Sequence, residues 1–168
     1  MFKHENEVNC VAFSPDGCSL VSGSDDCSVR MWNIRDGSSK NLPVDHTKSF
    51  MAVVFSPDGK HIAGGDLTKS LLWIWNSRTH KLVANWAGHN RSVWCVEFTP
   101  DGKGLMSGGM DRTVKYWDLS SLGIHEEVSG REDVNPGQPF PLIRSFSGHA
   151  VRFSFSFIVC GLLRHSLL

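Results

Sequence analysis

The chain is 168 residues long, which is enough for one ordinary domain. Its 17 basic and 17 acidic side chains cancel, and no basic stripe is visible, so the composition gives no support to direct contact with a nucleic acid. The five cysteines are odd in number and include no C-x-x-C pair, which indicates neither a zinc site nor a closed disulfide set. We therefore expect a reduced, intracellular protein.

Three segments of the chain superimpose on one another. They are VAFSPDGCSLVSGSDDCSVRMWN at 11–33, VVFSPDGKHIAGGDLTKSLLWIWN at 53–76 and VEFTPDGKGLMSGGMDRTVKYWD at 96–118. Their Pro-Asp-Gly turns begin at Pro15, Pro57 and Pro100, which are 42 and 43 residues apart. A period in the low forties that ends in Trp-Asp or Trp-Asn is typical of the four-stranded blades of a β-propeller.

Each segment predicts strands that are joined by short turns. Apolar residues lead into the Pro-Asp-Gly motif, in which proline restricts φ and glycine closes the turn. Alternating runs such as SLVSGS (19–24) and GLMSGG (104–109) follow, and after a polar turn come runs such as SVRMW (28–32). No amphipathic helical pattern lies between them. We therefore expect an all-β fold, a partial β-propeller of three four-stranded blades plus the start of a fourth.

Each repeat also has a histidine ten residues before the Ser or Thr of its turn: His4, His46 and His89. This pattern resembles the WD-repeat family, in which His, Ser or Thr, Asp and Trp hold a blade together. By position, the resemblance implies two complete structural sets: His4, Ser22, Asp26 and Trp32 in repeat one, and His89, Ser107, Asp111 and Trp117 in repeat three. In each set the indole would donate to the hydroxyl, the hydroxyl to the imidazole and the imidazole to the carboxylate.

Repeat two departs from the pattern. It keeps His46 and Trp75 but has Gly64 where the serine belongs. Asp66 and Lys69 flank the place of the missing aspartate, and the segment is one residue longer. We infer a bulged or loosened turn between its second and third strands and an incomplete network around its histidine. This blade is predicted to be the softest of the three.

The functional surface is expected at the rim, where loops enter the innermost strands. The family resemblance places partner-contacting positions just after the histidine and just before the turn aspartate. They are Glu7, Asn9 and Asp25 in repeat one, Ser49 and Met51 in repeat two, and Ser92, Trp94 and Met110 in repeat three. Trp94 is the strongest candidate because tryptophan is enriched among binding hot spots. The alternative is that Trp94 packs into the blade.

Sets of Ser, His and Asp invite comparison with a hydrolase. The set occurs twice, each time with a tryptophan, and the sequence contains no G-x-S-x-G motif. The histidines, one per blade, are expected to lie too far apart to share a metal ion. We therefore predict a protein that is not an enzyme and has no catalytic residue, no metal site and no cofactor. A hydrolase remains a remote alternative.

The last part of the chain departs from the repeat. We place the repeats at about 4–46, 46–89 and 89–149, with an inserted loop at about 120–141 that is rich in Gly, Pro, Ser and acidic residues. LIRSFS (142–147) follows as an outer strand that matches LVANWA (82–87), and SGH (147–149) opens a fourth repeat. No Ser-Pro-Asp-Gly turn comes after it. We assign 1–157 to the propeller and expect 158–168 to come from a shifted frame, a retained intron or a truncated gene.

The tail is also too short to anchor the chain in a membrane. Its apolar run covers the eleven residues 153–163, and two of them are serines. A membrane-spanning helix needs about 20 predominantly apolar residues. We therefore expect no contact with a membrane.

A narrower resemblance covers roughly residues 4–149. SLVSGSDDCSVRMWNI (19–34) and GHNRSVWCVEFTPDGKGLMSGGMDRTVKYWDLSS (88–121), with the polar insertion after the latter, resemble fungal general transcriptional corepressors of the Tup/Groucho class. That resemblance implies a nuclear, non-catalytic scaffold that binds DNA-bound repressors and chromatin components but not DNA. Another WD adaptor, such as a ubiquitin-ligase substrate receptor, is the alternative.

Two features of such corepressors are not found in these 168 residues. They are an N-terminal oligomerising helical segment and the remaining blades of a seven-bladed ring. Repeats of this kind bury their cores against neighbours, and unpaired sheet edges favour association. We therefore expect missing blades or self-association to cover the open flanks.

Overall fold

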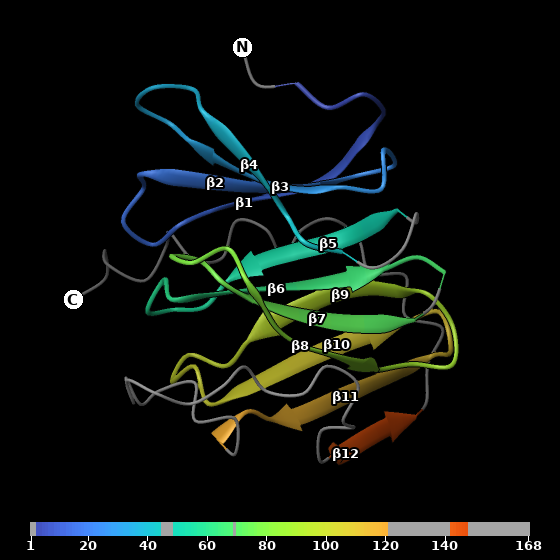
Figure 1. Ribbon diagram of the computed structural model, residues 1–168. Coiled ribbons are helices and arrows are strands. Elements are labelled where there is room, and N and C mark those ends of the chain that lie inside the picture. The colour runs from blue at the N-terminus through green and yellow to red at the C-terminus, as the bar shows by residue number, and fades with distance from the viewer. Residues whose placement is uncertain (1–2, 45–48, 69, 121–141, 148–168) are drawn as a thin grey trace, which may run out of the picture.

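The computed structural model describes residues 3–44, 49–68, 70–120 and 142–147. These residues form twelve strands, which pair into three separate four-stranded sheets (Figure 1). All strand pairs are antiparallel, and neighbouring strands in each sheet are also neighbours in the sequence. The described ranges contain no α-helix, so the predicted all-β class is confirmed.

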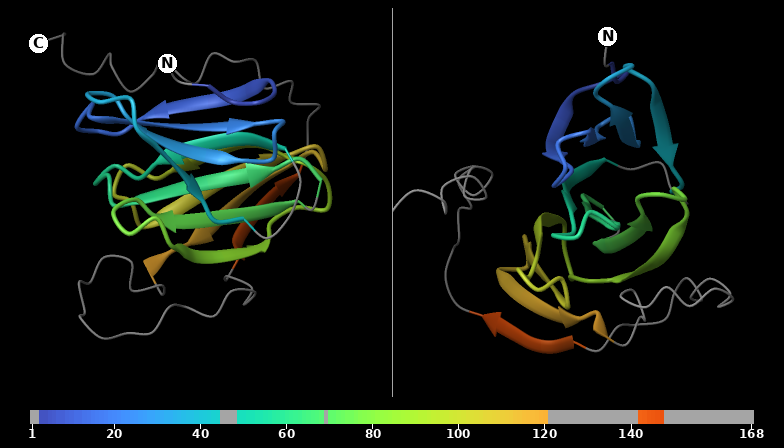
Figure 2. Two further views of the ribbon diagram at one scale, coloured as in Figure 1. Left: turned by 45° about the horizontal axis from the view of Figure 1, so that its top comes forward. Right: turned by 90° about the vertical axis from the view of Figure 1, so that its left-hand side faces the viewer.

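The three sheets are the expected propeller blades. Blade one consists of β1 (Val8–Phe13), β2 (Ser19–Ser24), β3 (Val29–Asn33) and β4 (Ser39–Leu42). Blade two consists of β5 (Phe50–Phe55), β6 (His61–Asp66), β7 (Leu71–Asn76) and β8 (Leu82–Ala87). Blade three consists of β9 (Val93–Phe98), β10 (Gly104–Gly109), β11 (Thr113–Asp118) and β12 (Leu142–Ser147). The blades follow one another in chain order in all views, and β5 lies between β1 and β9 (Figure 2).

Some expectations fall on residues that the structure does not describe. The strand predicted at 142–147 is present as β12, the outer strand of blade three. The inserted loop at 121–141, the start of a fourth blade after residue 147 and the tail at 158–168 lie outside the described residues. Among the described residues, no helix has the length and apolar character that a membrane crossing requires.

Each blade turns from its first to its second strand through the Pro-Asp-Gly motif. In blade one, the Ser14 hydroxyl donates to Asp16 Oδ1 at 2.5 Å, and a backbone amide donates to the same oxygen at 2.9 Å. Gly17 has a φ of 69°, in the left-handed region that glycine adopts without steric strain. Asp58 and Asp101 make the same bonds in the other blades. The motif therefore builds one tight turn three times.

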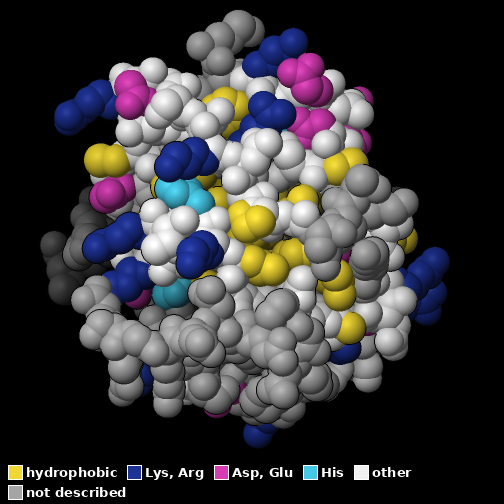
Figure 3. Space-filling model, viewed as in Figure 1, with side chains coloured by type: hydrophobic (Ala, Val, Ile, Leu, Met, Phe, Trp, Pro, Cys, Tyr) yellow, Lys and Arg dark blue, Asp and Glu magenta, His cyan; other side chains and the backbone are white. Residues whose placement is uncertain are grey.

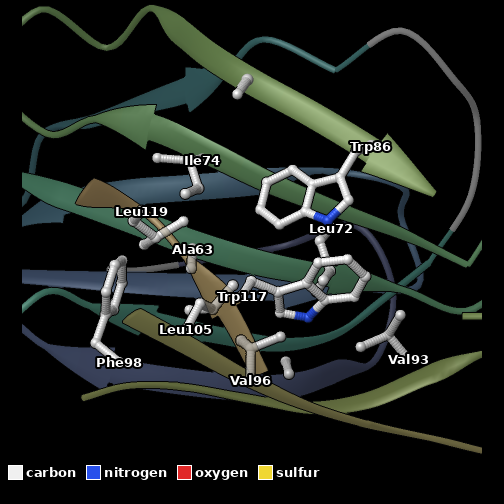
Figure 4. Close-up of a cluster of buried hydrophobic side chains, with 12 residues drawn as sticks. Ala63, Leu72, Ile74, Trp86, Val93, Val96, Phe98, Leu105, Trp117 and Leu119 are labelled. Carbon is white, nitrogen blue, oxygen red and sulfur yellow. The ribbon is translucent and has the colours of Figure 1, made fainter. Parts of the chain in front are cut away.

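Two apolar cores fill the spaces between the blades. The core between blades one and two is formed by Val21, Val29, Leu42, Phe50, Val53, Phe55, Ile62, Trp73 and Trp75. The core between blades two and three is formed by Ala52, Ala63, Leu72, Ile74, Ala84, Trp86, Val93, Val96, Phe98, Leu105, Trp117 and Leu119 (Figure 4). Both cores draw side chains from two sheets, so each blade is stabilised mainly by its neighbour.

Blade two lies between the other blades and is buried on both faces. All six residues of β6 are buried. Trp73 and Trp75 stack with ring centroids 5.8 Å apart, and Phe50 packs against both rings. The extra residue of this repeat is taken up in the turn between β6 and β7, and the pairing of the two strands stays regular. Blade two is therefore closely packed in spite of its departure from the motif, and its being the softest of the three stays a prediction.

Glycines allow neighbouring blades to approach closely. A Cβ atom built on Gly65 in β6 would lie 2.6 Å from Cγ1 of Val93 in β9, which is too close for two carbon atoms. The equivalent Gly23 in β2 lies against Phe50 in the same way, and its Cβ atom would be 2.9 Å from Cβ of Phe50. The small residue after the serine position is therefore required by the packing of the next blade.

We expect Gly65→Ala to lower the free energy of unfolding by about 1–3 kcal/mol, because the added methyl group overpacks the contact between blades two and three. Val93→Ala should also destabilise the protein, because it leaves a cavity. The double variant should lose less than the sum of the two, since the truncated side chain makes room for the new methyl group. Urea denaturation followed by tryptophan fluorescence measures all three proteins. Additive losses would contradict the close approach.

Candidate interaction site

Four residues of blade one are joined by a chain of hydrogen bonds. The Trp32 indole N–H donates to Ser22 Oγ at 2.7 Å, and Ser22 Oγ lies 2.6 Å from His4 Nε2. The other ring nitrogen, His4 Nδ1, lies 2.8 Å from Asp26 Oδ2. The chain runs from β3 across β2 to the segment before β1 and ends at the turn between β2 and β3.

Blade three contains the same arrangement. The Trp117 indole N–H donates to Ser107 Oγ at 2.9 Å, and this oxygen lies 2.8 Å from His89 Nε2. His89 Nδ1 lies 3.0 Å from both carboxylate oxygens of Asp111. The structure thus brings together both sets of residues that the sequence pattern singled out in repeats one and three.

The partners in each chain fit one direction of hydrogen bonding from the indole to the aspartate. An indole N–H can only donate, so the serine oxygen accepts it and the hydroxyl directs its own hydrogen to histidine Nε2. Histidine Nδ1–H then donates to the aspartate. Ser22 is 2% exposed and Ser107 is 1% exposed, so both hydroxyls are engaged inside the blade and neither is presented to a substrate.

The aspartates also hold the loops that lead into the first strands. Asp26 accepts a hydrogen bond from the Glu5 amide at 3.0 Å. Asp111 accepts the equivalent bond from the Asn90 amide at 3.0 Å. Each network therefore fixes the backbone just after its histidine, and this backbone is part of the rim.

Hydrogen bonding controls the charge state of the network. Burial raises the pKa of Asp26, but bonds from the Ser28 hydroxyl and from nearby N–H groups outweigh burial and hold it well below its usual range. Bonds from a backbone amide, from Thr113 and from the histidine have the same effect on the pKa of Asp111 against its burial. Burial lowers the pKa of His89 in spite of the opposing carboxylate. In blade three a neutral His89 imidazole therefore faces an ionised Asp111 at neutral pH.

Blade two holds its last tryptophan in another way. The Trp75 ring lies where a larger residue at position 64 would project, 2.9 Å from a Cβ atom built on Gly64. Its indole N–H donates to the Pro43 carbonyl at 2.8 Å and not to a serine. His46 lies outside the described residues. The sequence could not identify this backbone partner, because Pro43 lies outside the repeat motif.

The residue of the third strand that pairs with the serine position of the second strand also differs in blade two. In the other blades it is a cation over the tryptophan ring, with Arg30 at 5.9 Å and Lys115 at 5.7 Å from the ring centroid. In blade two it is Trp73, which stacks on Trp75 and donates its indole N–H to Asp66 at 3.4 Å. Aromatic stacking therefore takes the place of the cation over the tryptophan ring.

One β-bulge per blade positions the first set of rim residues. The ladder between the first and second strands skips one residue in each blade, and the skipped residues are Asn9, Met51 and Trp94. A bulge turns a side chain away from the regular alternation of a strand. These three predicted rim residues therefore occupy equivalent places at the same end of the blades.

One backbone hydrogen bond per blade positions the second set. The amides of Asp25, Leu67 and Met110 donate to the carbonyls of Glu7, Ser49 and Ser92, each at 2.9 Å. The structure thus places all eight predicted rim residues at one end of the blades and adds Leu67. Position counting missed Leu67 because repeat two lacks the turn aspartate from which the count was made.

The rim residues differ in what they offer to a partner. Trp94 is 45% exposed and Met110 is 43% exposed, so both present apolar surface. Asn9 is half-buried, and its side-chain amide donates to Asp25 Oδ1 at 2.7 Å and to the Phe50 carbonyl at 3.2 Å. Asn9 therefore ties blade one to blade two, whereas the tryptophan and the methionine are available for contact.

The charge of the rim changes from blade to blade. Blade one contributes Glu7, which is exposed, and Asp25, which is half-buried. Blade three contributes the exposed Arg91 and Arg112. On the face shown in Figure 3, Asp and Glu side chains lie mostly over the upper part, together with several Lys and Arg side chains. At the rim itself, blade one therefore contributes carboxylates and blade three contributes apolar side chains with flanking arginines.

The repeated four-stranded blades, two of them with the same buried polar chain, define a β-propeller repeat protein. The family description "WD domain, G-beta repeat" matches residues 1–33, 39–76 and 80–118. The chain belongs to this family, and the family resemblance drawn from the sequence is confirmed at this level.

Solved structures have the same fold. "Structure of U3-55K" superimposes with a TM-score of 0.73 and 23% identity, and covers 89% of this chain and 42% of that one. "Crystal structure of RRP9 WD40 repeats" gives a TM-score of 0.72 and 23% identity, over 89% of this chain and 41% of the other. At this identity the likeness shows the fold alone.

Relatives in several systems share the repeat. The chain is 30% identical to nuclear distribution protein nudF 1 of Talaromyces marneffei, over 70% of this chain and 26% of that protein. It is 35% identical to transcription initiation factor TFIID subunit 5 of Caenorhabditis elegans, over 46% of this chain and 12% of that protein. It is 26% identical to human U3 small nucleolar RNA-interacting protein 2, over 45% of this chain and 18% of that protein. The chain therefore spans a small part of these relatives, which support the WD repeat and not the narrower corepressor class.

Ser22→Ala and Ser107→Ala are each expected to lower the free energy of unfolding by about 1–3 kcal/mol, because the substitution leaves a buried indole N–H and an imidazole without their partner. Ser39→Ala, at an exposed serine of β4, serves as the matched control and should stay within about 0.5 kcal/mol of the parent. Chemical denaturation compares the three variants. Equal stability of all of them would contradict a structural role for the network.

Acid should weaken the fold in two steps. The lowered pKa of His89 means that the unfolded chain binds its proton first, so stability is lost as pH falls below about 6.5, the ordinary histidine pKa. The lowered pKa values of Asp26 and Asp111 add a second loss, which begins near pH 3.8 and continues as pH falls toward the folded values. The free energy of unfolding measured against pH should show both losses, and Asp111→Asn should make the loss at lower pH smaller. An unchanged loss at low pH in this variant would contradict the role given to Asp111.

Proposed function

We propose that the chain is a non-catalytic scaffold that binds other proteins through the rim. The observation that carries this proposal is the exposure of Trp94 and Met110 at neighbouring rim positions. An indole supplies a large contact area with little loss of conformational entropy, and tryptophan is enriched among binding hot spots. No cofactor and no chemical step are needed for this function.

The networks behind the rim support a binding role. His89 and Asp111 hold the backbone at Asn90, and the Met110 amide holds the carbonyl of Ser92. A contact surface that is already fixed loses less entropy on binding than a mobile one. The backbone of the rim is thus preorganised for binding.

We further propose that the scaffold is part of a nuclear transcriptional corepressor, whose partners are DNA-bound repressors or chromatin components. The sequences of repeats one and three resemble those of corepressors of the Tup/Groucho class, and a TFIID subunit among the relatives is compatible with a nuclear location. Glu7 and Asp25 make part of the rim acidic, which suits a basic protein segment better than a nucleic acid. The scaffold would then reach DNA only through other proteins.

A tethering assay tests the proposal. The chain is fused to a heterologous DNA-binding domain and placed upstream of a reporter gene, where we expect repression. Trp94→Ala should reduce repression strongly, because loss of a hot-spot side chain weakens binding by about tenfold or more. Glu7→Lys should do the same if the partner is basic, and Thr79→Ala, in an exposed turn of blade two, is the control. Repression that is absent, or that survives both rim substitutions, would contradict the proposal.

A further inference from the structure

The exposed apolar side chains fall into three groups. The large hydrophobic residues exposed in the described part of the chain are Val8, Val11, Phe13, Ile34, Trp94, Met106, Met110 and Phe146. Trp94 and Met110 belong to the rim. Val8, Val11, Phe13 and Ile34 lie on the side of blade one that faces away from blade two, here named the front face. Met106 and Phe146 lie on the side of blade three that faces away from blade two, here named the back face.

Every residue of the front face has a buried counterpart in blade three. The exposed fractions of Val8, Val11, Phe13 and Ile34 are 49, 43, 67 and 39%. Their counterparts 85 residues later are Val93, Val96, Phe98 and Leu119, with exposed fractions of 0, 7, 6 and 0%. The counterparts are buried because blade two covers them. The front face therefore has the composition of a surface that another blade covers.

The back face has the complementary character. Met106 is 39% exposed, whereas its counterparts Val21 and Ala63 are fully buried. Phe146 is 52% exposed and pairs with the third strand of its blade as Leu42 and Trp86 do in theirs, and these two are 2% and 3% exposed. In blades one and two these positions cover the next blade. The back face is therefore built to cover a front face.

We propose that the chain associates head to tail with a second copy of itself, the back face of blade three in one copy covering the front face of blade one in the other. The chain already makes this kind of junction twice, between blades one and two and between blades two and three. Within the described residues it also carries the two exposed faces that a third junction of this kind would join. A second copy therefore supplies a surface of the required composition.

The contact is heterologous, since two different faces meet. Heterologous contacts close into a ring when the rotation permits and otherwise continue as an open chain. Two copies with three blades each supply six blades, which lies within the range of about four to eight that closed propellers use. A dimer with two identical junctions is therefore the smallest closed product.

Glu97 lies on the back face and should oppose this contact. It is opposite Met106 in the ladder between β9 and β10, at the position that Ala12 occupies in blade one. Covering a carboxylate removes it from water and disfavours the contact. Glu97→Ala gives blade three the residue of blade one and should strengthen the association.

Sedimentation of the 168-residue chain over a range of concentrations tests the proposal. We expect a concentration-dependent species larger than a monomer. Phe13→Glu places a charge in the front face and Met106→Glu places a charge in the back face. Each should weaken the association by about tenfold or more. Thr79→Glu adds the same single charge in an exposed turn of blade two and should leave the association unchanged. Circular dichroism shows whether each variant keeps its sheets.

Mixing the two single-face variants distinguishes this junction from other kinds of association. Phe13→Glu retains an intact back face and Met106→Glu retains an intact front face, so an equal mixture should form one junction and stop at a dimer. Association through two front faces would instead persist in Met106→Glu alone. A parent chain that stays monomeric, whether residues 148–168 or nothing at all cover the faces, would overturn the proposal. So would association that survives both charged variants, a mixture that stays monomeric, or a Glu97→Ala chain that associates less.

Discussion

The packing of one sheet face against the next is the constraint on which the rest of the structure depends. A four-stranded blade has two faces, and neither apolar core of this chain is built from a single sheet. Burial on this scale is the main favourable term in folding. It also dictates details that look local, such as Gly23 and Gly65, whose missing side chains make room for the following blade. The stability of each blade is therefore a property of a pair of blades.

The interior of a blade is stabilised by either of two chemistries. Blades one and three use a polar chain from tryptophan through serine and histidine to aspartate, and a cation covers the indole. Blade two uses two stacked tryptophans and a backbone acceptor. The polar chain reaches the surface and fixes the rim, whereas the aromatic stack remains inside. The same outer geometry is thus obtained with a serine and with a glycine at the position beside the last tryptophan.

The surfaces of the chain follow from this division. At the rim, bulges and single backbone bonds place Asn9, Met51 and Trp94 in register across three blades. On the outer flanks, residues that would be core in a middle blade are exposed, because no described residue covers them. The first kind of surface suits partners of varied sequence, and the second suits only another blade. The two proposed contacts, with partners and with a second copy, therefore use different parts of one fold.

The sequence by itself determined the repeat, the class of fold and the tight turns, because all of these depend on spacing within one repeat. The residues of the two complete networks followed from the family resemblance that the repeat carries. The sequence also placed β12 beyond a long insertion, because the pattern of an outer strand is local. Tertiary structure alone decided the rest. Leu67 joins the rim through a backbone bond, Trp75 finds the carbonyl of Pro43, and blade two is well packed although its motif is incomplete. Equal residues such as Phe13 and Phe98 differ in exposure only because one has a neighbouring blade, and no pattern within a single repeat records which neighbour is present.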